Sequence, residues 1–279
     1  MIIDVHTHIS EPSHYGKEFF ADMHGAWSEV DLTAGTPDNH KLGTQDAARV
    51  VVLAFDAPAT GLEVPNEYVA NYVASDPERL IGFASVDPNR DDAVDILRSA
   101  VNDLGLRGLK TAPIYQNYDP LSANADRLFA EAARLELPVL IHQGTTFLRS
   151  APLRYARPWL LDEVAQRHPT MTMYIAHLGH PWCDETMAVI RKHPRMFSDV
   201  SALQKRPMQL YGALRSAIEY EVADKLLFGT DFPFSSVAST IAGMSDVSAM
   251  SERVGLPPIP MSVVDEITYR PSLDLLGLS

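Results

Sequence analysis

Short apolar runs rich in β-branched residues recur along the chain and alternate with amphipathic stretches. Eight runs have the length and composition of strands: 2–5, 49–55, 80–86, 106–110, 138–141, 171–176, 196–200 and 226–229. They show little apolar–polar alternation, which is typical of strands buried on both faces of a parallel sheet. The pattern therefore predicts a largely parallel α/β fold.

Helical spacing of apolar residues predicts helices between these runs, over 91–104, 123–135, 159–167, 186–192, 209–221 and 263–276. Two of these stretches end in the similar sequences His168-Pro169 and His193-Pro194. Cationic residues and a following proline suit a helix C-terminus. We therefore expect His168 and His193 to end helices rather than to take part in chemistry.

Eight strand–helix units in a chain of 279 residues match a (β/α)8 barrel, the TIM barrel. A doubly wound sheet would more often have a glycine-rich phosphate turn after its first strand, where this chain has His6-Thr7-His8. We expect one barrel domain over 1–279. The longest gap, 9–48, has weak periodicity and is predicted to be a long loop over the active-site face.

The charge and the composition of the chain limit the kinds of partner that it is expected to bind. The chain has 23 basic and 36 acidic residues, a net charge of −13, so phosphate contacts to nucleic acid are not expected. No run approaches the roughly 18 apolar residues of a membrane span. The single cysteine, Cys183, and an N-terminus without a basic leader segment predict an unprocessed, cytoplasmic chain. A small-molecule substrate is expected, and the chain could form a homo-oligomer.

Polar side chains of the metal-binding type follow four of the predicted strands. His6 and His8 project to the same side of strand one, because residues two apart in a strand share a face. His142, His177 and Asp231 follow the fifth, sixth and eighth strands. The C-terminal strand ends of a barrel form its active-site face. Burying these five groups together without a cation would be costly, so the pattern predicts a divalent transition-metal site.

Several separated motifs resemble the amidohydrolase superfamily, and within it the amidohydrolase-related branch that includes aminocarboxymuconate-semialdehyde decarboxylase. The matching pieces are Asp4-Val5-His6-Thr7-His8, Arg107-Gly108-Leu109-Lys110, Leu140-Ile141-His142, Ile175-Ala176-His177-Leu178-Gly179 and Phe228-Gly229-Thr230-Asp231-Phe232-Pro233. The resemblance implies a metal-dependent barrel. It leaves the reaction open, because the same framework serves hydrolases, decarboxylases, hydratases and isomerases.

The resemblance also implies roles for these residues. His6, His8, His142 and Asp231 would bind one divalent ion, with zinc expected, while His177 stays off the metal and moves protons together with Asp231. Many aromatic-acid decarboxylases of the branch look like Glu-x-His at strand one, and this chain has His6 there.

Lys110, at the end of strand four, has three interpretations. Two-metal amidohydrolases place a carboxylated lysine there, and His142 and His177 could then hold a second ion. Related one-metal proteins look as if they use such a lysine to bind a substrate carboxylate. A buried ion pair is the third interpretation. We expect one ion, with Lys110 binding substrate.

Further candidates lie in the loops after the strands. Arg149, in a loop that also carries Arg154 and Arg157, is a candidate for binding an anionic substrate, since guanidinium groups bind carboxylates bidentately. Lys205 and Arg206 follow strand seven and support an anionic substrate. His180 is a candidate for lining the substrate pocket.

The leading hypothesis is a metal-dependent hydrolase of a small, carboxylated amide, lactone or related compound, in which metal-activated water attacks the carbonyl. The alternative is a metal-dependent, non-oxidative decarboxylase of a small aromatic or muconate-like acid. A non-catalytic scaffold is disfavoured, because it would not need polar groups at so many strand ends.

Overall fold

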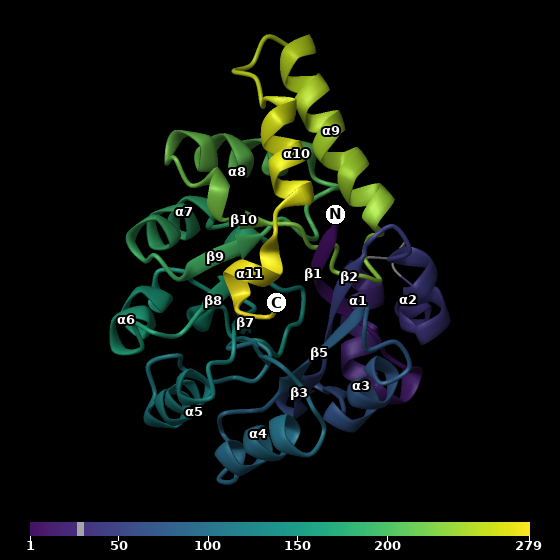
Figure 1. The fold of residues 1–279 in the computed structure, drawn as a ribbon, viewed down its shortest axis with the longest axis vertical. Helices are drawn as coiled ribbons and strands as arrows, with labels where there is room; N and C mark the ends of the chain where they lie inside the picture. The colour runs from purple at the N-terminus through teal and green to yellow at the C-terminus, as the bar shows by residue number, and fades with distance from the viewer. Residues whose placement is uncertain (27–30) are drawn as a thin grey trace.

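A closed ring of eight parallel strands forms the centre of the fold (Figure 1). The computed structural model describes residues 1–26 and 31–279. The strands occur in the order β1 (Ile3–His8), β2 (Arg49–Leu53), β5 (Leu80–Ser85), β6 (Leu109–Thr111), β7 (Val139–Ile141), β8 (Met173–Ile175), β9 (Met196–Asp199) and β10 (Leu226–Leu227). The ring closes where Val5 N–H donates to Phe228 O (3.0 Å) and His8 N–H donates to Phe232 O (2.9 Å). The predicted (β/α)8 barrel is confirmed.

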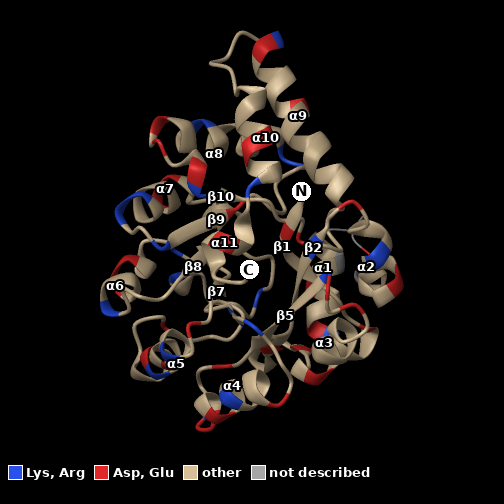
Figure 2. Ribbon diagram, viewed as in Figure 1, with Lys and Arg blue, Asp and Glu red and all other residues tan. Residues whose placement is uncertain are grey.

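Helices surround the strands and carry most of the charged side chains, while the strands are largely uncharged (Figures 1 and 2). The helices between strands are α3 (Asn66–Val73), α4 (Ala93–Asn102), α5 (Ala123–Arg134), α6 (Leu160–Arg167), α7 (Cys183–Lys192) and α8 (Pro207–Glu219). In α4 the buried residues Ala93, Leu97 and Ala100 recur at helical spacing and form one apolar face toward the core.

Two apolar layers hold the barrel together: one between strands and helices, and one inside the ring. The inner layer includes Phe83 and Tyr174, both completely buried, and it continues into Leu273 and Leu276 of α11 (Ser272–Leu276). Because the same layer contains Ile3 at the start of β1, α11 closes the N-terminal end of the barrel. The opposite end is left for the strand-end residues.

Two strand predictions change in the structure. β1 continues past the predicted end at Val5 and includes His6 and His8. The run 49–55 divides into β2 and β3 (Phe55–Ala57), and β3 pairs antiparallel with β4 (Leu62–Val64) outside the barrel. The small hairpin follows from tertiary pairing that a local apolar run does not encode.

The segment 9–48 was expected to be a loop, but it contains α1 (Lys17–Ala26) and α2 (Pro37–Gly43); residues 27–30 lie outside the described range. In α2, Thr36 accepts from Asn39 N–H and Pro37 stands at the first helical position, so the start signal was present in the sequence. In α1 the buried residues Phe19 and Met23 lie one turn apart.

The chain after β10 forms α9 (Val237–Arg253), which was not predicted, and then α10 (Met261–Tyr269) and α11. The predicted helix 263–276 is thus broken in two at Arg270-Pro271, because proline lacks the N–H that would continue a helix. Among the described residues we find no helix that is both long and apolar enough to cross a membrane.

Candidate active site

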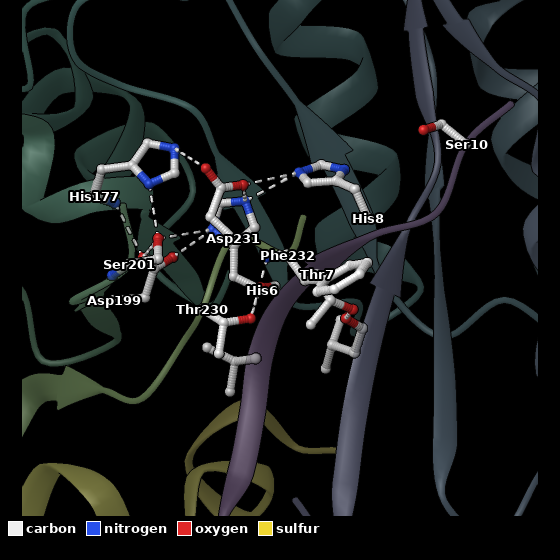
Figure 3. Close-up of polar contacts among 12 residues, drawn as sticks. His6, Thr7, His8, Ser10, His177, Asp199, Ser201, Thr230, Asp231 and Phe232 are labelled. Atoms are coloured by element: carbon white, nitrogen blue, oxygen red, sulfur yellow. Dashed lines mark hydrogen bonds and ion pairs between the residues drawn. The ribbon is translucent and has the colours of Figure 1, made fainter. Parts of the chain in front are cut away.

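The polar strand-end residues meet at the end of the barrel opposite α11. Three of them, His6, His8 and Asp231, form a compact group (Figure 3). His6 Nε2 lies 3.2 Å from His8 Nε2, and each of these nitrogens lies 3.4 Å from Asp231 Oδ1. Asp231 N–H donates to His6 O (2.8 Å), which fixes the turn after β10 against β1.

A buried carboxylate below this turn supports the group. Asp4 accepts from Thr230 N–H (3.0 Å), from Thr230 Oγ1 (2.7 Å) and from His6 N–H (3.2 Å). Burial raises the pKa of Asp4 to about 7, and the hydrogen bonds from Thr230 and His6 oppose that rise. Asp4 therefore connects the strand that carries His6 to the turn that carries Asp231.

Asp199, at the end of β9, orients His6 and was not singled out from the sequence. Its Oδ2 accepts from His6 Nδ1 at 2.9 Å. Since a carboxylate can only accept, His6 Nδ1 carries the proton and Nε2 keeps its lone pair. The signal was available, because Asp199 ends an apolar run just as His142 and His177 do.

The other carboxylate oxygen of Asp199, Oδ1, holds the backbone of His177 in place. Asp199 Oδ1 accepts from His177 N–H (3.0 Å) and from the hydroxyl of Ser201. Ser201 Oγ lies 2.7 Å from His177 Nδ1. Because the hydroxyl hydrogen points to Asp199, Ser201 Oγ accepts from Nδ1–H, which leaves a lone pair on His177 Nε2.

His177 Nε2 faces Asp231 Oδ2 at 3.9 Å (Figure 3). Burial lowers the pKa of His177 to about 4, and the negative charge of Asp231 opposes this shift. Both residues have left-handed backbone conformations, with φ of 56° at His177 and 58° at Asp231. Such conformations are uncommon for residues with side chains and concentrate at functional sites.

The His6, His8 and Asp231 donors fit a divalent metal ion. The His6 Nε2 lone pair and the Asp231 carboxylate face each other at 3.4 Å, so they repel unless a positive charge lies between them. Burial also lowers the pKa of His8, which favours a neutral imidazole. Two imidazole nitrogens and a carboxylate oxygen are a usual ligand set for zinc and related ions. His6, His177 and Asp199 also lie within 4.8 Å of one another, but both Asp199 oxygens already accept hydrogen bonds.

His142, predicted as the fourth metal ligand, stands beside this group rather than in it. Its Nε2 lies 3.4 Å from Thr145 O, and its ring contacts those of His177 and Tyr115, with centroids 5.1 Å and 4.9 Å away. Burial lowers the pKa of His142 well below its usual value. A neutral imidazole is the form that can bind a metal, and its role as a ligand stays a prediction.

Lys110 is the middle residue of β6, lines a cavity and is 1% exposed. Its Nζ lies 5.6 Å from the centroid of the Phe55 ring. Within residues 1–26 and 31–279, no hydrogen-bond acceptor or carboxylate pairs directly with this Nζ. Burial lowers the pKa of Lys110 to about 8, although Asp231 and Asp199 favour its charged form.

A cavity with two adjoining lobes opens above these residues. Tyr115, His142, Phe147, His177, Asp231 and Phe234 line both lobes. The first, which we call the apolar lobe, also has Lys110, His6, His8, Phe19, Met23, Phe55, Leu62 and Val64 in its walls. The second, the cationic lobe, also has Thr145, Thr146, His180 and Arg206. His180 thus lines the cavity, and its contact with substrate stays a prediction.

Other sequence candidates lie elsewhere. The Arg149 side chain is 84% exposed, pairs with Asp22 at 2.6 Å and is not among the residues that line either lobe. Its expected contact with substrate is therefore not supported by its position. His168 and His193 lie at the C-terminal ends of α6 and α7, as expected, and pair with Asp126 and Asp162.

Comparison with known proteins gives a family match over most of the chain. A model of the amidohydrolase family matches residues 3–248. Gamma-resorcylate decarboxylase of Rhizobium sp. (strain MTP-10005) is 24% identical over 272 residues, covering 76% of this chain and 81% of that protein.

Solved structures share the fold at low sequence identity. An uncharacterized TIM-barrel protein of Bordetella bronchiseptica has a TM-score of 0.73 at 17% identity, over 99% of this chain and 98% of that chain. A dihydroxybenzoic acid decarboxylase from Polaromonas sp. JS666, solved with manganese and the inhibitor 2-nitroresorcinol, has a TM-score of 0.65 at 17% identity, over 100% and 98%.

Proposed function

Because the chain belongs to the amidohydrolase family, we propose that it is a metal-dependent, non-oxidative decarboxylase of a small aromatic or muconate-like acid. Sequence reasoning ranked a hydrolase first and a decarboxylase as the alternative. The relative from Rhizobium is a decarboxylase, which supports the alternative over the hydrolase.

The observation that carries this proposal is the position of Lys110. A buried ammonium group, with no direct acceptor among the residues that the structure describes, stands in a lobe that also contains His6, His8 and Asp231. A substrate carboxylate would supply the missing negative charge. The neighbouring walls, with Phe19, Phe55 and Tyr115, suit a flat unsaturated frame.

His6, His8 and Asp231, with His142 as the predicted fourth ligand, would hold the metal. When bound, a divalent ion would supply positive charge that orients substrate oxygen atoms and stabilises negative charge as it develops. Asp199 would keep the His6 Nε2 lone pair directed at the ion through its bond to Nδ1.

The remaining residues would orient the substrate and move a proton. Lys110 would hold the carboxylate while the aromatic walls hold the frame. The neutral His177 Nε2 would accept a proton from the substrate or from water, with Asp231 stabilising the imidazolium. The bond to the carboxylate carbon then breaks, its electron pair stays on the substrate carbon, that carbon takes the proton from Nε2, and carbon dioxide leaves.

A substrate panel in deuterium oxide tests this function. The metal-reconstituted protein is incubated with aromatic and muconate-like acids labelled with ¹³C in the carboxylate, and in parallel with lactones and amides. We expect labelled carbon dioxide and one deuterium at the former carboxylate position, with His177→Asn as the inactive control. Hydrolysis of a lactone or amide without carbon dioxide release from any acid would contradict the proposal.

A further inference from the structure

Tyr115 stands at the junction of the two lobes, and its hydroxyl has no part in the reaction proposed above. It lies in the loop after β6 and lines both lobes. Its ring packs edge-on against that of Phe55, a residue of the apolar lobe, with centroids 5.5 Å apart. Its hydroxyl bonds to Thr146, a residue of the cationic lobe. A ligand that extends from one lobe into the other therefore passes this side chain.

The hydroxyl of Tyr115 accepts one hydrogen bond and keeps its own hydrogen free to donate. Thr146 Oγ1 donates to Tyr115 Oη at 3.0 Å and itself accepts from Leu148 N–H at 3.3 Å. Within residues 1–26 and 31–279, no acceptor takes the phenolic hydrogen. Buried tyrosine hydroxyls usually find such an acceptor, and Tyr115 is 9% exposed. An oxygen atom of a ligand in the cavity would complete the hydrogen bonding of this group.

Tyr118, three residues further along the same loop, lacks such a free hydrogen. Thr111 Oγ1 donates to Gln116 Oε1 (2.9 Å), so the Tyr118 hydroxyl donates to Thr111 Oγ1 (2.5 Å). Tyr118 is also buried, but it is not among the residues that line either lobe. The donor at Tyr115 is thus a feature of its place in the cavity wall and not of every buried tyrosine in this loop.

Tyr115 is held in place and remains a donor at neutral pH. Its N–H donates to Ala112 O and its carbonyl accepts from Thr60 Oγ1, both at 3.0 Å, while its ring packs edge-on against His142. Burial raises the pKa of Tyr115 to about 12, and the negative charge of Asp231 adds to this rise. The hydroxyl therefore keeps its hydrogen and lies within the electrostatic reach of the predicted metal site.

We propose that Tyr115 determines specificity by donating a hydrogen bond from its hydroxyl to an oxygen atom, of a hydroxyl or a carbonyl group, on the unsaturated frame of the substrate. This inference rests on the proposed function in taking the cavity as the site of a small unsaturated acid. Lys110 would hold the carboxylate, and Tyr115 would hold an oxygen that stays on the frame. Because that oxygen does not react, the bond acts on binding more than on the chemical step.

Sulfonate analogues test the proposal, because a sulfonate carries a negative charge like a carboxylate but cannot release carbon dioxide. The probes are the ortho, meta and para isomers of hydroxybenzenesulfonate and of formylbenzenesulfonate. Each hydroxyl probe is compared with its methyl counterpart and each formyl probe with its ethenyl counterpart, by calorimetry on the metal-loaded protein. For at least one ring position, we expect the oxygen-bearing probes to bind about fivefold more tightly, the usual net effect of one hydrogen bond. A formyl oxygen only accepts, so its preference identifies the protein group as a donor.

Tyr115→Phe keeps the ring and removes the hydroxyl. It should abolish both preferences and leave the affinity for the methyl and ethenyl probes unchanged. Tyr118→Phe is the matched control, since it removes a buried tyrosine hydroxyl of the same loop that is already bonded to Thr111, and it should keep both preferences.

Several results would overturn the proposal. They are unchanged preferences in Tyr115→Phe, equal losses in Tyr118→Phe, a preference in the wild type for hydroxyl probes alone or for none, weaker binding of every probe in Tyr115→Phe, and no binding of any probe. The outcome is independent of turnover. Preferences lost in Tyr115→Phe without carbon dioxide release from any acid would support the role of Tyr115 and contradict the decarboxylase, and the reverse pattern would do the opposite.

Discussion

Asp199 Oδ2 accepts a hydrogen bond from His6 Nδ1 at 2.9 Å, and both side chains are completely buried. The same carboxylate holds Ser201 and the backbone of His177 through its other oxygen. One residue of β9 thus orients a predicted metal ligand and the predicted proton carrier. The arrangement would connect the predicted metal binding and the predicted proton transfer through hydrogen bonds of one carboxylate.

Asp199→Asn should weaken metal binding. The amide keeps the shape of the carboxylate but lacks the charge that raises the basicity of His6 Nε2, and such outer partners typically contribute 10- to 100-fold in metal affinity. Competition with a chelator measures the affinity. The double variant His6→Ala, His8→Ala supplies the reference for complete loss in a folded barrel. A metal affinity of Asp199→Asn equal to that of the wild type would contradict this role of Asp199.

Ser201→Ala should lower kcat by about tenfold without changing KM or metal content. Without the hydroxyl, His177 Nδ1 loses the acceptor that fixes its proton, so Nε2 is less often the free nitrogen. Ser198→Ala is the matched control, because it removes a buried hydroxyl three residues earlier, in β9, that bonds to Ile175 O instead. Equal losses in the two variants would indicate a general packing effect.

The sequence predicted the barrel and His6, His8, His177 and Asp231 because each of these residues follows an apolar strand run, which is a local signal. Asp199 follows the same rule, but its role depends on His6 and Ser201, and His6 meets Asp199 only once β1 and β9 are placed together.

The roles of other site residues could not be predicted from the sequence, because they depend on contacts between segments that are far apart in the chain. Arg149 was predicted to bind substrate from its loop position, yet it pairs with Asp22 of α1, a helix hidden in a segment of weak periodicity. Arg206 lies five residues after Ser201, and its local sequence marks it only as one of several loop cations. Its place in the cavity depends on the packing of three loops.

His177→Asn and Asp231→Asn should each reduce turnover on the order of a hundredfold, as loss of a general acid or base does. His177→Asn should retain its metal, because the His177 imidazole bonds to Ser201 and is not part of the group of His6, His8 and Asp231 that would hold the ion. His168→Asn, at the end of α6 and paired with Asp126, should change turnover little. Turnover and metal content are measured on all three variants. Similar losses of turnover in His168→Asn and His177→Asn would contradict a catalytic role of His177.

Glu131 provides a test of stability in acid. It is held between Arg98 (2.8 Å) and Arg134 (2.6 Å), whose hydrogen bonds lower its pKa to about 2. Because the folded pKa lies below the unfolded one, this stabilisation is present above the ordinary pKa of glutamate and is lost as the pH falls toward 2. Glu131→Gln should therefore cost about 1 kcal/mol at pH 7 and progressively less below pH 4.5.

Thermal unfolding across this pH range measures the effect. Asp95→Asn removes a carboxylate that also pairs with Arg98 but is 80% exposed, and it should change Tm little at any pH. A loss in Glu131→Gln that is constant from pH 7 to pH 3 would show that the carboxylate charge is not the cause.

Lys110→Met should weaken substrate binding without lowering the stability of the fold. Methionine fills the space of the lysine side chain without its charge. The KM for a carboxylate substrate should therefore rise at least tenfold, while the metal content stays near one ion per chain. Tm should stay the same or rise, because an apolar group replaces a buried ammonium that has no direct acceptor in the described part of the chain. A carboxylated lysine bridging two ions predicts a different result: two metals in the wild type, loss of metal in Lys110→Met, and recovery of stripped wild-type protein that depends on bicarbonate. Metal analysis together with Tm and KM on the two proteins therefore distinguishes a substrate-binding lysine from a metal-bridging one, and a drop in Tm without a change in KM would leave Lys110 with a structural role alone.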